Sequence, residues 1–196
     1  MSSPPGPLVV LVRHGETEWS RDGRHTGSRS DPPLTEVGRA AARALAPRLA
    51  GRQFALVLTS PLQRAGETAR LAGLDGVEVE PDLREWDYGE YEGLTTAQIR
   101  EHAPGWTIWT GGCPGGETIE QVAARADSVI GRVRAALGPE QAAALVAHGH
   151  ILRVLASRWV GAPPQAGGWL ALDTASLSDL GWEREAAVVS HWNLTA

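Results

Sequence analysis

The stretch LVVLVRHGE, residues 8–16, places five aliphatic residues directly before an arginine, a histidine and a glycine. An apolar run of this length is typical of a strand that is buried on both faces, as in the centre of a parallel sheet. Such a strand ends at the edge of its sheet, where Arg13 and His14 would lie. Two explanations are open: the strand simply reaches the surface and turns, or His14 is held there to act on an anion.

Two further apolar runs favour the second explanation. Ala55–Thr59 is followed by SPLQR, residues 60–64, and Ala143–Ala147 is followed by His148-Gly149-His150. Open α/β sheets bind their ligands beyond the carboxyl ends of their strands. The three runs are therefore predicted to bring Arg13, His14, Arg64 and His148 to one edge of a sheet.

Helical patterns alternate with these strands, which predicts an α/β fold with a largely parallel sheet. Thr118 and Gln121 have the spacing of a capping box at the start of one helix. Pro47 predicts a kink or an end in another helix, and Pro61 is placed in the first turn of a third. The predicted helices are Thr35–Leu49, Pro61–Ala72, Thr118–Leu137 and Ile151–Val160, and the predicted pair of edge strands is Ala175–Trp182 with Ala187–Trp192.

The composition limits the function. A net charge of −5 argues against a general nucleic-acid or membrane-surface partner. The chain has no lysine, which excludes Schiff-base catalysis through that residue. Cys113 is the single cysteine, so the chain forms no internal disulfide and no cysteine-rich metal site. The first residues lack the pattern of a signal or a membrane span, and we expect a soluble cytoplasmic protein.

The polar residues suit phosphoryl transfer. Arginine binds a dianionic phosphate through paired N–H groups, and Arg13 and Arg64 are the candidates. A histidine with cationic neighbours is kept neutral near pH 7, so His14 can be a nucleophile. A leaving alkoxide needs a proton from a nearby acid. The segment LREWDYGEYEG, residues 83–93, offers four acids for that purpose: Glu85, Asp87, Glu90 and Glu92.

Arg13-His14-Gly15, Arg64, Glu85 in its segment and His148-Gly149 together resemble, in order, the motifs of the histidine phosphatase superfamily, in its phosphoglycerate-mutase-like branch. The resemblance extends from Leu8 to about Trp159 and implies one domain over residues 1–196. It also implies a doubly wound α/β fold with a mostly parallel sheet and helices on both faces. The implied mechanism passes through a phosphohistidine and uses no metal and no cofactor.

The resemblance assigns a role to each matching position. His14 would be the nucleophile, Arg13, Arg64 and His148 the phosphate pocket, and Glu85 the proton donor, with Asp87 close enough to be an alternative. Ser20, Thr26 and Gly27 lie in the loop that holds phosphate or substrate in relatives, although Ser20 and Thr26 could instead cap that loop. Gly15 is expected because a side chain at this turn would crowd the phosphate, and His150 is expected either behind the residues that contact the ligand or at the rim of the site.

The branch contains mutases as well as phosphatases. Mutases carry an asparagine where Ser20 stands and need further cationic groups, yet residues 101–120 contain no arginine. These departures favour hydrolysis, and the loops resemble the subgroup of acid phosphatases and sedoheptulose-1,7-bisphosphatases. The resemblance therefore implies a small phosphorylated metabolite as the partner, a sugar phosphate or bisphosphate, and a homodimer. A 2,3-bisphosphoglycerate-dependent phosphoglycerate mutase and a non-catalytic phospho-ligand binding module are the alternatives.

Overall fold

Six strands form one sheet in the computed structural model, which describes residues 6–195. Their order is β3-β2-β4-β1-β5-β6, with β1, β2, β3 and β4 parallel and β5 antiparallel to both β1 and β6. The bounds are β1 (Leu8–Arg13), β2 (Leu56–Thr59), β3 (Val77–Val79), β4 (Ala142–Ala147), β5 (Leu177–Glu183) and β6 (Ala186–Leu194). The mostly parallel α/β sheet and its edge pair are confirmed.

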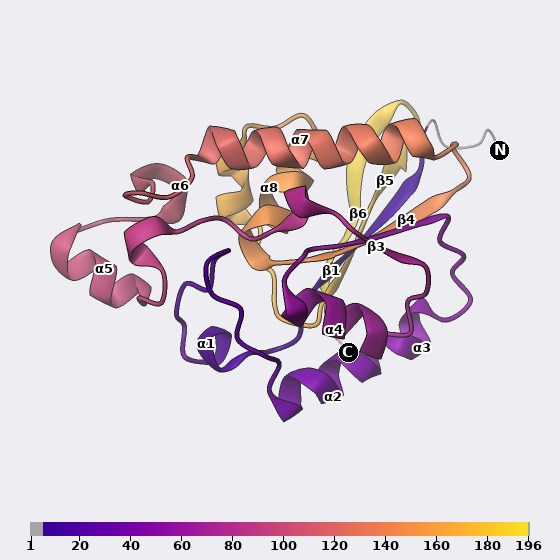
Figure 1. The fold of residues 1–196 in the computed structure, drawn as a ribbon. Coiled ribbons are helices and arrows are strands. Elements are labelled where there is room, and N and C mark those ends of the chain that lie inside the picture. The colour runs from indigo at the N-terminus through magenta and orange to yellow at the C-terminus, as the bar shows by residue number, and fades with distance from the viewer. Residues whose placement is uncertain (1–5, 196) are drawn as a thin grey trace.

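Helices cover both faces of the sheet (Figure 1). One face carries α2 (Glu36–Ala44), α3 (Ala46–Leu49) and α4 (Gln63–Leu71), and the other carries α7 (Ile119–Ala136) and α8 (Gly149–Trp159). Successive residues of β1 serve the two layers in turn: Val9 and Leu11 pack with the α7 and α8 side, and Val10 and Val12 with the other side. This alternation explains why the strand is apolar at every position from Val9 to Val12.

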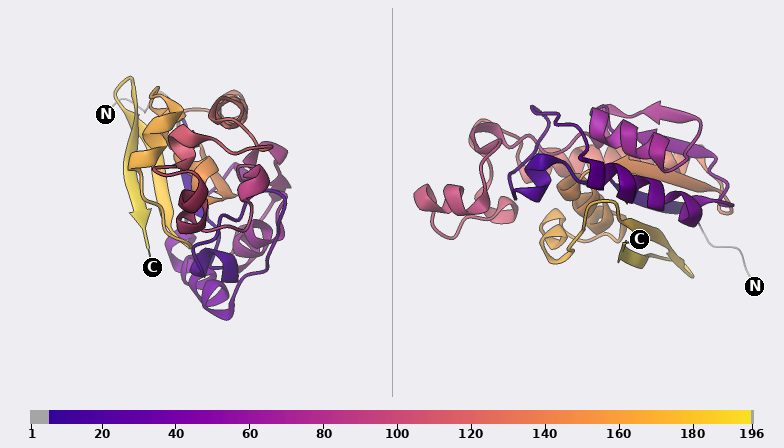
Figure 2. Two further views of the ribbon diagram at one scale, coloured as in Figure 1. Left: turned by 90° about the vertical axis from the view of Figure 1, so that its left-hand side faces the viewer. Right: turned by 90° about the horizontal axis from the view of Figure 1, so that it is seen from below.

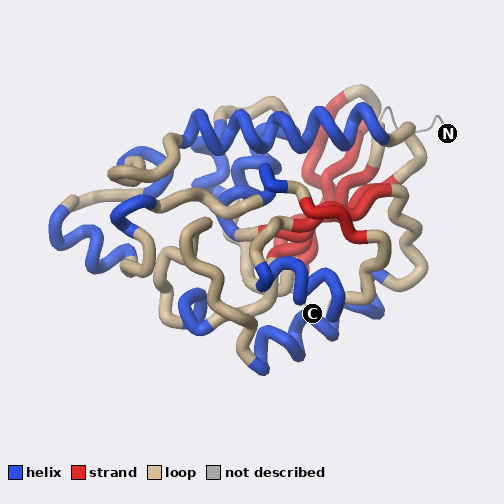
Figure 3. Tube along the Cα trace, in the orientation of Figure 1, coloured by secondary structure: helices blue, strands red, loops and turns tan. Residues whose placement is uncertain are grey.

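The shorter elements lie at one end of the molecule. Figures 2 and 3 show α1 (Glu18–Arg21), α5 (Thr96–His102) and α6 (Ile108–Gly111) at this end, among most of the long loops. Short 3₁₀ turns complete the chain at η1 (Pro81–Leu83), η2 (Gly89–Tyr91) and η3 (Pro164–Trp169). The carboxyl ends of β1 and β4 point toward the same end, as the sequence predicts. No helix within residues 6–195 is long and apolar enough to cross a membrane.

The break that Pro47 predicts in the helix over 35–49 is confirmed. The helix is divided at Leu45, and Pro47 lies in the first turn of the second piece, where a missing N–H costs nothing. Three other predicted starts are wrong: the helix starts at Pro61 and Ile151, the latter helix beginning at Gly149, and the strand start at Ala175. Pro61 lies outside α4, because the backbone N–H of Gln63 is bound by the Asp31 carboxylate at 2.7 Å and the helix begins there.

The third wrong boundary is the start of β5. The strand begins at Leu177, because Ala175 turns at a φ of 52° and donates its N–H to the carbonyl of His14 at 3.0 Å. This turn ties the last segment of the chain to the end of β1.

Candidate active site

A cavity of about 200 Å³ opens at the carboxyl ends of β1 and β4. Its wall includes side chains from segments far apart in sequence, among them Arg13, His14, Glu85, Tyr88, His150 and Arg153. Five of the predicted site residues therefore meet here: Arg13, His14, Ser20, Thr26 and Glu85. Glu85 is the one carboxylate among the residues that line this cavity.

His14 is fixed in one tautomer at the floor of the cavity. Its Nδ1 lies 2.7 Å from the carbonyl of Gly15, which can only accept, so the proton is on Nδ1 and Nε2 keeps its lone pair. Burial lowers the pKa of His14 well below its usual value, and the charges of Arg64 and Arg13 lower it further. The imidazole is therefore neutral with a free Nε2, which is the form a nucleophile requires.

Gly15 is required for a reason other than the expected one. A Cβ at this position would lie 2.5 Å from the backbone carbonyl of Gly38 in α2, and a Cβ at Gly38 would lie 2.2 Å from the carbonyl of Glu16. The two glycines thus let the loop after β1 cross α2 at backbone contact. The φ of Gly15 is not in the left-handed region, so close packing against the helix, rather than a sharp turn at the phosphate, demands the glycine.

Arg64 and His148 lie together behind the cavity. Arg64 is fully buried, and its Nε donates to His148 Nδ1 at 3.2 Å. Its other four N–H groups are directed to the carbonyls of Ser30, Thr26 and Gly27 and the carboxylate of Asp31. Because His148 Nδ1 accepts, neutral His148 carries its proton on Nε2, 2.6 Å from Ser60 Oγ. Neither side chain lines the cavity, although the rings of His14 and His148 are only 5.0 Å apart.

Arg13 lines the cavity and has an N–H donor without a hydrogen-bond partner within residues 6–195. Its Nη1 donates to the carbonyl of Leu172, while its buried Nε has no hydrogen-bond partner within residues 6–195. Burial lowers the pKa of Arg13 and the negative charge of Glu85 opposes that effect, but an arginine remains cationic in either case. Arg13 is thus available to an anion in the cavity.

Glu85 is held by the start of α8. Its Oε1 accepts from the backbone N–H groups of Trp86 and Ile151, both at 2.9 Å, and its Oε2 accepts from that of His150 at 3.0 Å. The N-cap residue His148 offers no side-chain cap, so the carboxylate caps this helix from another segment. Asp87, the alternative acid, is instead paired with Arg29 at 2.7 Å and does not line the cavity.

The three loop residues have separate contacts. Ser20 and Thr26 line the cavity, and the Ser20 hydroxyl also completes the capping box of α1 with Thr17. Gly27 does not line it: its N–H donates to Glu92 at 3.0 Å and its carbonyl accepts from Arg64. Gly27 therefore supports the cavity wall from behind.

The comparison with known proteins agrees with this geometry. A model of the histidine phosphatase superfamily (branch 1) matches residues 9–195. The chain belongs to the histidine phosphatase superfamily. It is an enzyme of the histidine phosphatase type.

Three similar proteins show how far the likeness extends. An acid phosphatase of Mycobacterium tuberculosis (strain ATCC 25618 / H37Rv) is 45% identical over 92% of this chain and 91% of its own length. A sedoheptulose 1,7-bisphosphatase of Saccharomyces cerevisiae is 35% identical over 79% of this chain and 68% of its own. The solved structure of a mycobacterial glucosyl-3-phosphoglycerate phosphatase with VO3 has a TM-score of 0.87 at 32% identity, covering 96% of this chain and all of that one.

Sequence reasoning missed a paired tyrosine and histidine in this histidine phosphatase. The Tyr88 hydroxyl lies 2.5 Å from His150 Nδ1 in the cavity wall. Burial raises the pKa of Tyr88 well above, and lowers that of His150 well below, their usual values, so both groups are neutral. His150 is therefore one of the residues that line the cavity. The HGH and YGEYEG motifs contain both residues, but only the fold shows that they meet.

Two arginines that line the cavity share a property that the sequence alone does not show. Arg24 and Arg153 have no carboxylate partner within the described part of the chain. Arg153 lies over the ring of Trp109, 4.6 Å from its centre, and its Nε donates to the carbonyl of Gly167. The cavity thus carries more positive than negative charge.

Proposed function

We propose that this enzyme is a metal-independent phosphomonoesterase, which hydrolyses a small phosphorylated metabolite through a phosphohistidine on His14. One observation carries the proposal: the neutral His14 ring offers its free Nε2 to a cavity that also contains Arg13 and Glu85. A nucleophile, a phosphate-binding cation and an acid are the groups that a covalent route needs. A site for binding alone needs neither the nucleophile nor the acid.

In the first step, His14 Nε2 attacks phosphorus and the bond from phosphorus to the ester oxygen breaks. Glu85 gives its proton to that oxygen, while Arg13 stabilises the charge on the transferring group. In the second step, water attacks the phosphohistidine, Glu85 takes the proton of the water, and inorganic phosphate leaves. In the proposal, Arg64 supplies positive charge from behind this site and neutral His148 is an N–H donor beside it, with Ser20 and Thr26 at its wall.

The substrate we propose is a phosphorylated sugar or a related bisphosphate. A cavity of about 200 Å³ suits a small molecule, and Arg24 and Arg153 supply positive charge beyond Arg13. Two of the similar proteins named above, the sedoheptulose 1,7-bisphosphatase and the glucosyl-3-phosphoglycerate phosphatase, act on phosphate esters of this kind, as their names state. No three histidine, cysteine, aspartate or glutamate side chains within residues 6–195 are grouped so as to hold a metal ion.

The test is phosphate release from a panel of sugar phosphates and bisphosphates, run beside a coupled phosphoglycerate mutase assay with and without 2,3-bisphosphoglycerate. Phosphate release that is strongest on one member supports the proposal and names the substrate. Isomerisation of 3-phosphoglycerate with little phosphate release identifies a mutase instead. Neither activity in the folded protein would favour a binding module.

The setting of the enzyme is part of the same proposal. We place it in the cytoplasm, as one domain that forms a homodimer and has no nucleic-acid or membrane partner. Sedimentation equilibrium measures the oligomeric state, and cell fractionation measures the location. A monomer, or a protein found outside the cytoplasm, would contradict this part of the proposal but would leave the proposed reaction unaffected.

A further inference from the structure

The loop that carries Glu85 is fixed on both sides by one buried ion pair, Glu117 with Arg125. We propose that this pair positions Glu85 for proton transfer, so that its loss impairs catalysis of the step in which the leaving oxygen is protonated. The inference rests on the proposed role of Glu85 as the proton donor. It assigns a function to two residues that lie outside the cavity and do not touch the substrate.

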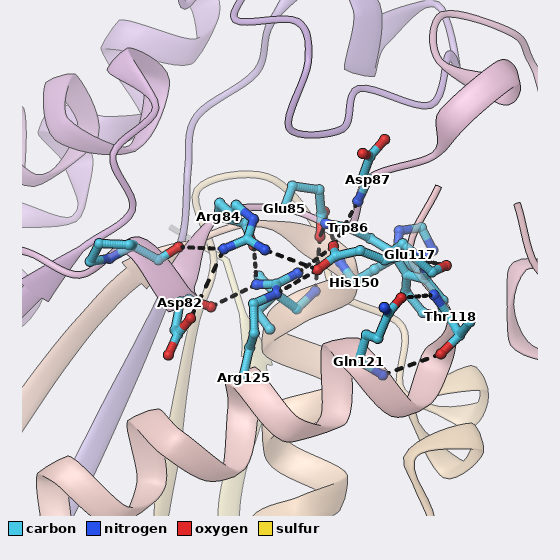
Figure 4. Close-up of polar contacts among 12 residues, drawn as sticks. Asp82, Arg84, Glu85, Trp86, Asp87, Glu117, Thr118, Gln121, Arg125 and His150 are labelled. Atoms are coloured by element: carbon cyan, nitrogen blue, oxygen red, sulfur yellow. Dashed lines mark hydrogen bonds and ion pairs between the residues drawn. The ribbon is translucent and has the colours of Figure 1, made fainter. Parts of the chain in front are cut away.

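The ion pair itself is bidentate. Arg125 Nε lies 2.9 Å from Glu117 Oε1, and Arg125 Nη2 lies 2.7 Å from Glu117 Oε2. Arg125 is 7% exposed and stands on α7, one of the long core helices (Figure 4). Glu117 directly precedes Thr118, whose capping box with Gln121 fixes the start of the same helix. Both partners are thus attached to one rigid element.

Each partner then holds the backbone next to Glu85. Arg125 Nη1 donates to the carbonyls of Asp82 and Arg84, at 2.7 and 2.9 Å, on the amino-terminal side. On the carboxyl-terminal side, Glu117 Oε2 accepts from the N–H of Asp87 at 3.0 Å, and the Glu117 carbonyl accepts from Trp86 Nε1 at 2.9 Å. Figure 4 shows these contacts on either side of Glu85.

A purely structural role is the competing explanation. A buried ion pair often adds little net stability, because desolvation of the charges offsets their attraction. Here, however, the other contacts of the pair are all with the Glu85 loop: three are with its backbone, and Glu117 Oε1 also accepts from the Arg84 side chain at 3.1 Å. The Glu85 carboxylate is held in turn by the start of α8. A small displacement of a catalytic group from its productive position costs catalysis long before it unfolds the protein.

The test compares Glu117→Gln with the wild type on a series of substituted phenyl phosphates, from p-nitrophenyl to p-methoxyphenyl phosphate. This variant keeps the shape of the side chain but turns one accepting oxygen into a donor. We expect kcat/KM, which reports the first step, to fall by about 10- to 100-fold for the poorest leaving group, with little change for p-nitrophenyl phosphate. The dependence of kcat/KM on leaving-group pKa should therefore steepen, as we also expect for Glu85→Gln.

A matched control and a double variant separate positioning from stability. Asp127→Asn removes the ion pair between Arg158 and Asp127, whose contacts of 2.9 and 3.1 Å also join α7 to α8. This pair does not contact the Glu85 loop. The Asp127→Asn variant should leave the leaving-group dependence unchanged. Glu85→Gln with Glu117→Gln should be about as slow as Glu85→Gln alone, because both changes remove one function.

The outcomes distinguish the two proposals. Equal losses on all leaving groups for Glu85→Gln would overturn the role of Glu85, and the positioning role with it. A steeper dependence for Glu85→Gln but uniform losses for Glu117→Gln, or losses that multiply in the double variant, would overturn the positioning role alone. If Glu117→Gln does not fold, Arg125→Lys keeps the charge but loses the forked contacts, and the same criteria apply to it.

Discussion

A single hydrogen bond determines which ring nitrogen of His14 is free to react. The bond from Nδ1 to the carbonyl of Gly15 leaves Nε2 as the reactive atom, and burial keeps the ring neutral. His14→Ala removes that atom from a site whose other groups remain. We predict a loss of kcat of at least about a thousandfold in a phosphate-release assay, since no other group supplies the nucleophile.

His102→Ala is the matched control for this prediction, because His102 is exposed on α5, outside the cavity. It should keep full activity, and circular dichroism should show both variants folded. An activity of His14→Ala within tenfold of the wild type, an approximate limit for losing a nucleophile, would reject His14 as that group.

Glu85 and Asp87 are two residues apart, yet only Glu85 reaches the cavity. Glu85→Gln keeps one oxygen acceptor for the start of α8 but has no proton to give. We predict that it lowers kcat/KM for an alkyl phosphate by about 100-fold or more, and that for p-nitrophenyl phosphate far less, because p-nitrophenolate leaves without a proton. Asp87→Asn should be nearly neutral in the same pair of assays. The opposite ranking would give Asp87 the acid role.

The contact between α2 and the loop after β1 gives a prediction of unusual sign. Alanine normally stabilises a helix by about 1 kcal/mol relative to glycine. At Gly38, however, a Cβ would meet the backbone of Glu16 at 2.2 Å. We predict that Gly38→Ala lowers the free energy of unfolding by about 1–3 kcal/mol, as overpacking does, and reduces activity because the loop follows His14 directly.

Gly131→Ala is the control for Gly38, because Gly131 lies in α7 with nothing within 4 Å of the added carbon. Urea denaturation should show it to be stabilising by about 1 kcal/mol or less. If both variants gained stability, the loop would be free to move away from α2.

Local patterns predicted the elements better than their ends. The runs 8–12, 55–59 and 143–147 became strands because each is apolar on two faces and both faces are covered. The sequence patterns did not predict the starts of helices that depend on residues far away in the chain. Asp31 sets the start of α4, and Glu85 caps α8 two residues before the predicted Ile151. Such contacts join residues far apart in sequence, so no local pattern contains them.

The site shows the same division. The order of the motifs predicted one site for His14, Arg13 and Glu85, and all three residues line one cavity. Their places at or near the ends of strands made this part of the site predictable. The pairing of Tyr88 with His150, and the use of every Arg64 donor by protein atoms, depend on how the loops fold over the strand ends. The roles of Arg64 and His148 as phosphate ligands stay a prediction.

Buried neutral histidines make the stability of the whole molecule depend on pH. Burial lowers the pKa of His14, His148 and His150 well below its usual value, and that of His25 to about 4. Below pH 6.5 the unfolded chain therefore binds protons that the folded chain does not. The contribution of these histidines to the free energy of unfolding is thus fully present above that pH and is lost as the pH decreases below it. Each such histidine contributes a slope of up to about 1.4 kcal/mol per pH unit.

Urea denaturation between pH 7.5 and 5.5, a window of about one unit on either side of the usual histidine pKa, measures this slope. His150→Gln should make it shallower, because one of the contributing groups is gone. Stability that is constant over the window, or that rises as the pH falls, would contradict the neutral buried histidines.

The proposed chemistry relies on arginines rather than on a metal. Dialysis against EDTA should therefore leave phosphate release unchanged, and adding Mg²⁺ or Zn²⁺ afterwards should not increase it. Loss of activity that is restored by one of these ions would require a different mechanism for this cavity.

The phosphoenzyme itself can be observed. The enzyme is mixed with a ³²P-labelled sugar phosphate substrate, quenched in alkali during turnover and digested, and the labelled peptide is sequenced. The structure predicts an acid-labile phosphate on His14, attached at Nε2 because Nδ1 is bound to Gly15. Label on another residue, label at Nδ1, or phosphate release with no labelled protein would contradict the proposed mechanism.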